Sequence, residues 1–146
     1  MDTTTLRTAW LLGLAGLLPF AACALGTFAA PDAWQGFARG ALIGYGAVVL
    51  SFLGAVHWGL ALRAPPEELP SGPGRLLLGV VPAVLGWFAL LLPDVFALPL
   101  LAVAILATAG VEQWARGRGL VPGEYLLLRW VLSLGAALCL ITPFAH

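Results

Sequence analysis

The sequence predicts an all-α integral membrane protein, folded as a single bundle of five transmembrane helices over residues 1–146. The composition indicates this class, since 61% of the residues are apolar and only 10% are charged. Soluble domains carry roughly a quarter charged residues, which cover a water-exposed surface. The apolar residues also fall into five stretches of about 20 residues, the length that a helix needs to cross a bilayer.

The five stretches are separated by segments that cannot continue a membrane helix. The expected spans are 6–29, 36–62, 75–92, 95–113 and 125–144. Prolines and charges fill the segment 63–74, and Pro93 with Asp94 makes a tight turn. The segment 114–124 is polar, and Pro122 suits the first turn of the helix that follows. Five crossings place the two termini on opposite faces of the membrane.

The arginines predict the orientation of the bundle. Lys and Arg accumulate on the cytoplasmic side of short connections. Six of the seven arginines lie on the face that the N-terminus shares with the second and fourth connections, and only Arg39 lies on the other. We therefore expect a cytoplasmic (or organelle-matrix) N-terminus and an external C-terminus.

An alternative treats the first span as a signal peptide. Arg7 precedes an apolar run, and the segment 20–23 loosely resembles a lipoprotein cleavage box. Cleavage there would leave four spans. Asp2 in the leading segment and Phe20 at the box speak against this interpretation.

Several function classes are excluded by what the chain lacks. Basic and acidic residues balance at seven each, so no basic surface for nucleic acid is expected. No phosphate-binding loop, dinucleotide fingerprint, nucleophile elbow or zinc-type spacing occurs, and we expect neither a metal nor a cofactor. Cys23 and Cys139 have no motif partners and are expected as buried free thiols, with a disulfide as the alternative.

The second span carries a stripe of small residues at spacings of three and four. Such residues let another helix approach closely in lipid. The expected helix-packing residues are Gly36, Gly40, Gly44, Ala47 and Gly54. We therefore expect this span to be central, with its stripe against other helices of the chain.

Polar residues gather at the cytoplasmic ends of three spans. His57 lies six residues before Arg63, roughly 9 Å inside the span at 1.5 Å per residue. Ionisable groups at such depth are candidates for function. The expected polar cluster or ligand site contains His57, Trp58, Ser51, Tyr45, Glu112, Tyr125 and Arg129.

A purely structural interpretation of these residues is equally available. Glu112 and Arg116 are four residues apart and can satisfy each other at a helix end. Arg129 can reach the interface along its own aliphatic stem. His57 can donate one hydrogen bond to a carbonyl and serve only to join two helices.

The segment 45–59 also carries a resemblance to a known family. Its distinctive elements are Ser-Phe-Leu-Gly at 51–54 and His-Trp-Gly at 57–59. Weaker matches are Pro19, Pro82, Trp87, Pro122, Tyr125, Leu128 and Arg129. The chain resembles the family of domain of unknown function 3429, which includes the transmembrane protein 69-like proteins of animal mitochondria. The resemblance implies a small multi-pass protein of bacterial or mitochondrial inner membranes, here the bacterial inner (plasma) membrane, and implies no established activity.

Two functions fit these observations. The first is a non-enzymatic accessory or assembly factor of an energy-transducing membrane, with the lipid bilayer and a membrane protein as partners. The second is a binder or transporter of a small apolar molecule, such as a quinone, porphyrin or lipid, with a cytoplasmic-side site around His57. An enzyme is the least favoured interpretation, because one His and one Glu are a thin catalytic set.

Overall fold

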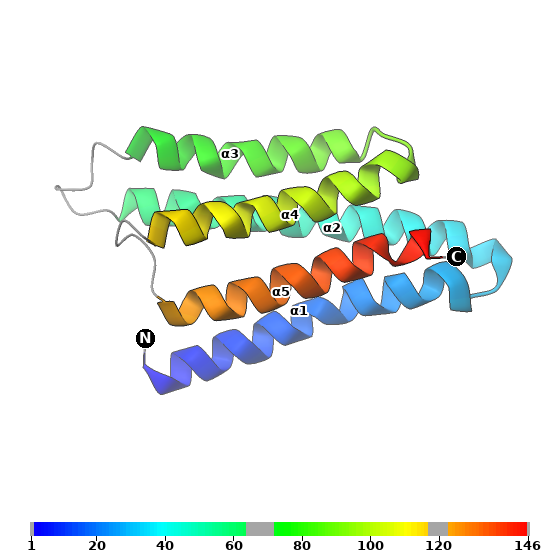
Figure 1. Ribbon diagram of the computed structural model, residues 1–146, viewed down its shortest axis with the longest axis horizontal. Helices are drawn as coiled ribbons and strands as arrows, with labels where there is room; N and C mark the ends of the chain where they lie inside the picture. Colours follow the sequence, from blue (N-terminus) through cyan, green and yellow to red (C-terminus); the bar gives the residue numbers. More distant parts are fainter. Residues whose placement is uncertain (1, 64–71, 117–122, 146) are drawn as a thin grey trace.

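Five long helices arranged side by side make up the fold. The computed structural model describes residues 2–63, 72–116 and 123–145, and of residues 115 and 116 it describes the backbone only. The elements are α1 (Thr3–Ala29), α2 (Asp32–Leu62), α3 (Gly72–Ala89), α4 (Asp94–Arg116), α5 (Gly123–Ile141) and the short 3₁₀ helix η2 (Thr142–Phe144). Successive helices run in opposite directions, and the two chain ends lie at opposite ends of the bundle (Figure 1). Within the described ranges all regular structure is helical, which confirms the predicted all-α class.

Four of the helices are long and apolar enough to cross a membrane. They are Thr3–Ala29, Asp32–Leu62, Asp94–Trp114 and Gly123–Phe144, whereas the apolar stretch of α3, Pro73–Ala89, is shorter. Large apolar side chains point outward from every helix, among them Leu11, Phe37, Leu77, Val103 and Leu138, each more than 60% exposed. Water disfavours such a surface and lipid does not. The chain is therefore a membrane protein built as a helical bundle.

The helices begin one to four residues before the positions that hydropathy predicts. α1 begins at Thr3, because the Asp2 carboxylate caps it by accepting a hydrogen bond from the Thr5 amide at 2.6 Å. This hydrogen bond lowers the pKa of the Asp2 carboxyl from its ordinary value. α2 and α4 begin at Asp32 and Asp94, whose negative charges suit a helix N-terminus. The polar residues ahead of these apolar stretches therefore belong to the helices, and at α1 a side-chain cap sets the first turn.

Helix ends also depart from the expected boundaries. α3 ends at Ala89, and the next three amides, Leu90 to Leu92, bond to carbonyls three residues back. A tightened last turn of this kind carries the helical path to Leu92. α5 ends at Ile141, and the following 3₁₀ turn contains Pro143, which cannot donate the next backbone bond.

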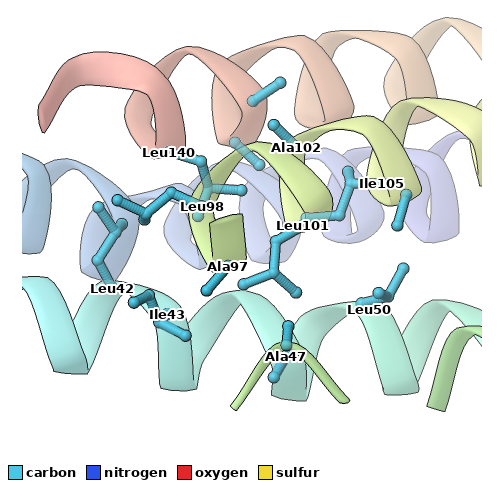
Figure 2. Packing of buried hydrophobic residues seen from close by; sticks show 14 of the residues in the cluster. Leu42, Ile43, Ala47, Leu50, Ala97, Leu98, Leu101, Ala102, Ile105 and Leu140 are labelled. Carbon is cyan, nitrogen blue, oxygen red and sulfur yellow. The ribbon is translucent and has the colours of Figure 1, made fainter. Parts of the chain in front are cut away.

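The apolar core lies where α2, α4 and α5 meet, with Phe20 of α1 against it. Figure 2 shows leucine and alanine side chains of α2 and α4 interleaving, with Leu140 reaching in from α5. The fully buried large residues include Phe20, Leu42, Leu50, Leu98, Leu101, Ile105 and Leu140. α2 contacts each of the other four long helices, as expected for a central span.

The stripe of small residues on α2 divides into two halves. At Gly36, Gly40 and Gly44 an added Cβ atom would meet no atom of the described chain within 4 Å. The expectation that these three glycines pack against another helix of the chain is wrong. α3 is much shorter than α2, and its close glycine contacts with α2 fall at Ala47 and beyond.

The second half of the stripe, Ala47 and Gly54, packs closely against α3. A Cβ on Gly54 would overlap the Gly79 carbonyl, and one on Gly86 would lie 2.9 Å from the Ala47 carbonyl oxygen. Small residues therefore meet small residues from both helices. The partner glycines, Gly79 and Gly86, are seven residues apart in the third apolar stretch, which is about two helical turns and places both on one face of α3.

Replacing Gly54 with Ala should therefore lower the free energy of unfolding by about 1–3 kcal/mol or more, because two backbones must separate. Gly44→Ala is the matched control and should stay within about 0.5 kcal/mol of the wild type. Thermal unfolding in detergent measures both. Equal losses in the two variants would contradict this packing.

Candidate functional site

A buried ion pair joins α4 to α5. Arg129 Nε donates to Glu112 Oε2 at 2.8 Å, and the two residues are 3% and 1% exposed. An unpaired charge at this depth would be costly, whereas a hydrogen-bonded pair offsets much of that cost. The second carboxylate oxygen, Oε1, is buried without a hydrogen-bond partner.

Two hydroxyl groups complete the setting of the guanidinium. Nη1 of Arg129 donates to Ser133 Oγ at 2.7 Å, and Nη2 donates to Thr108 Oγ1 at 2.6 Å. Thr108 in turn donates to the carbonyl of Ile105 at 2.7 Å. The guanidinium plane is therefore held on three sides by two helices.

Neither Ser133 nor Thr108 was among the site residues expected from the sequence. A signal for both was present, because Thr108 lies four residues before Glu112 and Ser133 lies four residues after Arg129. Residues four apart share one helix face. A hydroxyl residue four positions from a buried charged residue is therefore the sequence pattern that could have predicted Thr108 and Ser133.

His57 of α2 approaches the ion pair from the other side. Its Nε2 lies 3.6 Å from Glu112 Oε1, slightly beyond hydrogen-bonding distance. The imidazole is 6% exposed, and within the described chain neither ring nitrogen makes a hydrogen bond. Two buried polar groups that lack partners therefore face each other. We call His57, Thr108, Glu112, Arg129 and Ser133 the polar cluster.

The contact between α2 and α3 fixes the position of His57. Trp58 Nε1 donates to the Leu76 carbonyl at 3.0 Å, and its ring covers Gly79. Arg75, which is 8% exposed, donates to the carbonyl of Leu60 at 3.5 Å. The end of α2 that carries His57 is thus tied to α3 by two hydrogen bonds to backbone carbonyls.

Four of the expected site residues lie outside the cluster. Trp58 bonds to α3, and Ser51 donates to the Ala47 carbonyl of its own helix at 2.9 Å. Tyr45 donates to the Gly16 carbonyl at 2.8 Å and packs edge-on against Phe20. Both hydroxyls therefore donate to backbone carbonyls and not to the polar cluster.

Tyr125 is half-buried near the cluster. Both Glu112 and Arg129 act on it electrostatically, but none of its described contacts is a hydrogen bond to the cluster. The side chain of Arg116 lies outside the described residues, so the expected pair with Glu112 does too. Arg129 does not extend to the interface, because all three of its nitrogens bond inside the bundle. Cys23 and Cys139 are both free thiols.

Described residues line three cavities between the helices. The α1 groove, of about 190 Å³, lies between α1, α2 and α5, and Arg129, Ser133 and Tyr45 form its polar wall. The α3 pocket, of about 120 Å³, lies between α2, α3 and α4 and is lined by His57 and Thr108. The α5 groove, of about 280 Å³, is lined by apolar residues of α4 and α5 alone.

The polar cluster thus forms part of the wall of two cavities. α1 and α3 lie at opposite edges of the bundle in Figure 1, and each of these helices lines one of the two cavities. Arg129 and Ser133 face the first, and His57 and Thr108 face the second. Among the described residues no three His, Cys, Asp or Glu side chains gather as metal ligands.

These features define a small helical membrane protein with a charged cluster buried between cavities. The chain belongs to the family described as protein of unknown function (DUF3429), which matches residues 5–145. This confirms the family that the resemblance indicated.

Comparison with known proteins adds one relative. Over 90 residues the chain is 41% identical to transmembrane protein 69 of Xenopus tropicalis, in a match that covers 60% of this chain. The match covers 34% of that relative, so the chain corresponds to about a third of its length. No solved structure matches the chain.

Removing one partner of the ion pair should lower the free energy of unfolding more than removing both partners. Arg129→Leu leaves Glu112 charged and buried, and we expect a loss of about 3–5 kcal/mol in the free energy of unfolding. The double variant with Glu112→Leu should recover part of that loss. His57→Phe is the control, with an expected change below about 1.5 kcal/mol, because the ring makes no hydrogen bond. Equilibrium unfolding in detergent measures all three, and additive losses in the double variant would sink this account.

Proposed function

We propose that this protein binds a small lipophilic molecule inside the membrane, in the α1 groove. One observation carries the proposal: a buried, fully oriented arginine forms the polar part of an otherwise apolar groove. Binding sites for small molecules have this character, with mostly apolar walls and a few placed polar groups.

The groove presents hydrogen-bond donors to a ligand. A guanidinium has five N–H bonds, and the cluster uses one on each of the three nitrogens of Arg129. Two N–H bonds are left, and the Ser133 hydroxyl, which accepts from Arg129, still has its own proton to donate. The complementary ligand carries an acceptor oxygen, such as a carbonyl or an anionic oxygen.

The size of the groove favours a ligand with one ring. A cavity of about 150 Å³ lined by apolar side chains is known to hold benzene. The α1 groove, at about 190 Å³, accommodates a substituted ring of that kind. We therefore propose a lipophilic carbonyl compound with a single-ring head group, and a role in binding or carrying it without catalysis.

The accessory or assembly role is compatible with such binding. A non-enzymatic protein that holds a lipophilic molecule can deliver it to a larger complex of the same membrane. Copurification with that complex after mild extraction would support the role.

We also propose that all five helices span the membrane as one domain, with the N-terminus in the cytoplasm, in a bacterial inner membrane. The alternating direction of the helices in Figure 1 supports five crossings, as does the continuation of α3 to Leu92. The arginine bias supports the orientation. The family resemblance supports the compartment, while the matched relative is an animal protein.

Duroquinone should bind to the α1 groove, and durene, the same ring without carbonyls, should bind at least several-fold more weakly. Binding stabilises the folded state, so the midpoint of thermal unfolding in nanodiscs reports it. Gly16→Phe should abolish the shift, because Gly16 lines the groove and an added Cβ meets only the Tyr45 hydroxyl oxygen, at 3.8 Å, so that the larger ring fills the groove. Val103→Phe in the α5 groove is the matched control and should leave it unchanged. Equal shifts with the two compounds, or an unaltered shift in Gly16→Phe, would refute the site.

Reporter fusions test the topology. We expect fusions after Met1 and Pro66 to report the cytoplasm, and fusions after Asp94 and His146 to report the external side. Five crossings require Pro66 and Asp94 to lie on opposite faces. Finding them on the same face would mean that α3 does not span the membrane.

A further inference from the structure

The α3 pocket contains an acceptor where the α1 groove contains donors. Among the described residues that line it, His57 and Thr108 alone have polar side chains, and the Thr108 hydroxyl already donates to Ile105. Leu50, Val81 and Leu85 form apolar walls. Any polar interaction with a bound molecule therefore falls mainly on the imidazole.

The groups around His57 favour one protonation state and one tautomer of its imidazole. Glu112 already neutralises Arg129, so a charged His57 would leave a net positive charge in the bundle, which the neutral ring avoids. A neutral ring has one N–H and one lone pair. Placing the hydrogen on Nε2 directs it toward Glu112 Oε1, whereas a lone pair there would face the carboxylate. Nδ1 then carries the lone pair and accepts hydrogen bonds.

We infer that the α3 pocket is a second binding site, which takes a single-ring molecule bearing a hydroxyl group that donates to Nδ1 of His57. Its volume of about 120 Å³ is close to that of an apolar cavity that holds benzene, about 150 Å³. The pocket is partly open, and Val81 and Ala107 at its wall are exposed on the outside of the bundle. A lipophilic phenol can therefore enter from the membrane.

The second site is distinct from the α1 groove in both place and chemistry. The lining residues of the two cavities do not overlap. The α1 groove selects a molecule with an acceptor oxygen, and the α3 pocket selects a molecule with a donor hydroxyl. The inference does not depend on the function proposed for the α1 groove, and each site can be blocked separately.

The test uses p-cresol and p-xylene, which differ in a hydroxyl and a methyl group. The chain has two histidines, so ¹⁵N-histidine labelling in a His146→Ala background reports His57 alone. In nanodiscs, p-cresol should shift the Nδ1 resonance in a saturable manner, and p-xylene should not. His57→Phe should weaken p-cresol binding about twofold to tenfold, the range for loss of one neutral hydrogen bond, and leave p-xylene binding unchanged.

Two further variants separate the two sites. Ala107→Phe, at an exposed position of the pocket wall, should abolish the p-cresol shift, and Gly16→Phe in the α1 groove should leave it intact. Loss of the shift in Gly16→Phe, or its persistence in Ala107→Phe, would overturn the inference. No shift at saturating p-cresol, or an equal shift with p-xylene, would overturn it as well. Failure of duroquinone binding alone would affect only the α1 groove.

Discussion

The ion pair between Glu112 and Arg129 is the interaction on which the other polar contacts of the bundle depend. It fixes α4 against α5 at a depth where neither charge would be tolerated alone. The same guanidinium bonds to Thr108 and Ser133. Ser133 lines the α1 groove and Thr108 lines the α3 pocket, so the ion pair positions a polar side chain in the wall of each cavity. Because Oε2 is taken by Arg129, only Oε1 is left for His57.

His57 depends on a second constraint, the close packing of α2 against α3. Gly54 and Gly79 bring two backbones together, and Trp58 then closes over Gly79 and bonds to the Leu76 carbonyl. The imidazole lies between these anchors and α4. Apolar packing thus determines how closely the histidine approaches the carboxylate, since no hydrogen bond within the described chain holds the ring.

Hydropathy was sufficient for the helical class and for the order of the elements, because long apolar runs leave few alternatives in lipid. It could not locate the helix starts at Thr3 and Asp32, which lie in polar sequence before the apolar stretches, the first of them capped by the Asp2 side chain. It also identified His57, Glu112 and Arg129 by their depth. It could not tell that Gly44 and Gly54, on one stripe, have different surroundings, since that depends on where α3 meets α2. Nor could it show that Tyr45 donates to Gly16 of another helix, a contact that depends on helix rotation.

The ion pair also has a consequence for biosynthesis. Arg129 follows Glu112 by only 17 residues, so the two charges leave the ribosome in quick succession. A charged side chain costs free energy when its helix enters the bilayer alone, and pairing with the opposite charge across a helical hairpin reduces that cost. The physics favours joint entry of α4 and α5 into the bilayer as a preassembled hairpin. The partner that neutralises each charge is thus supplied by the chain itself during synthesis.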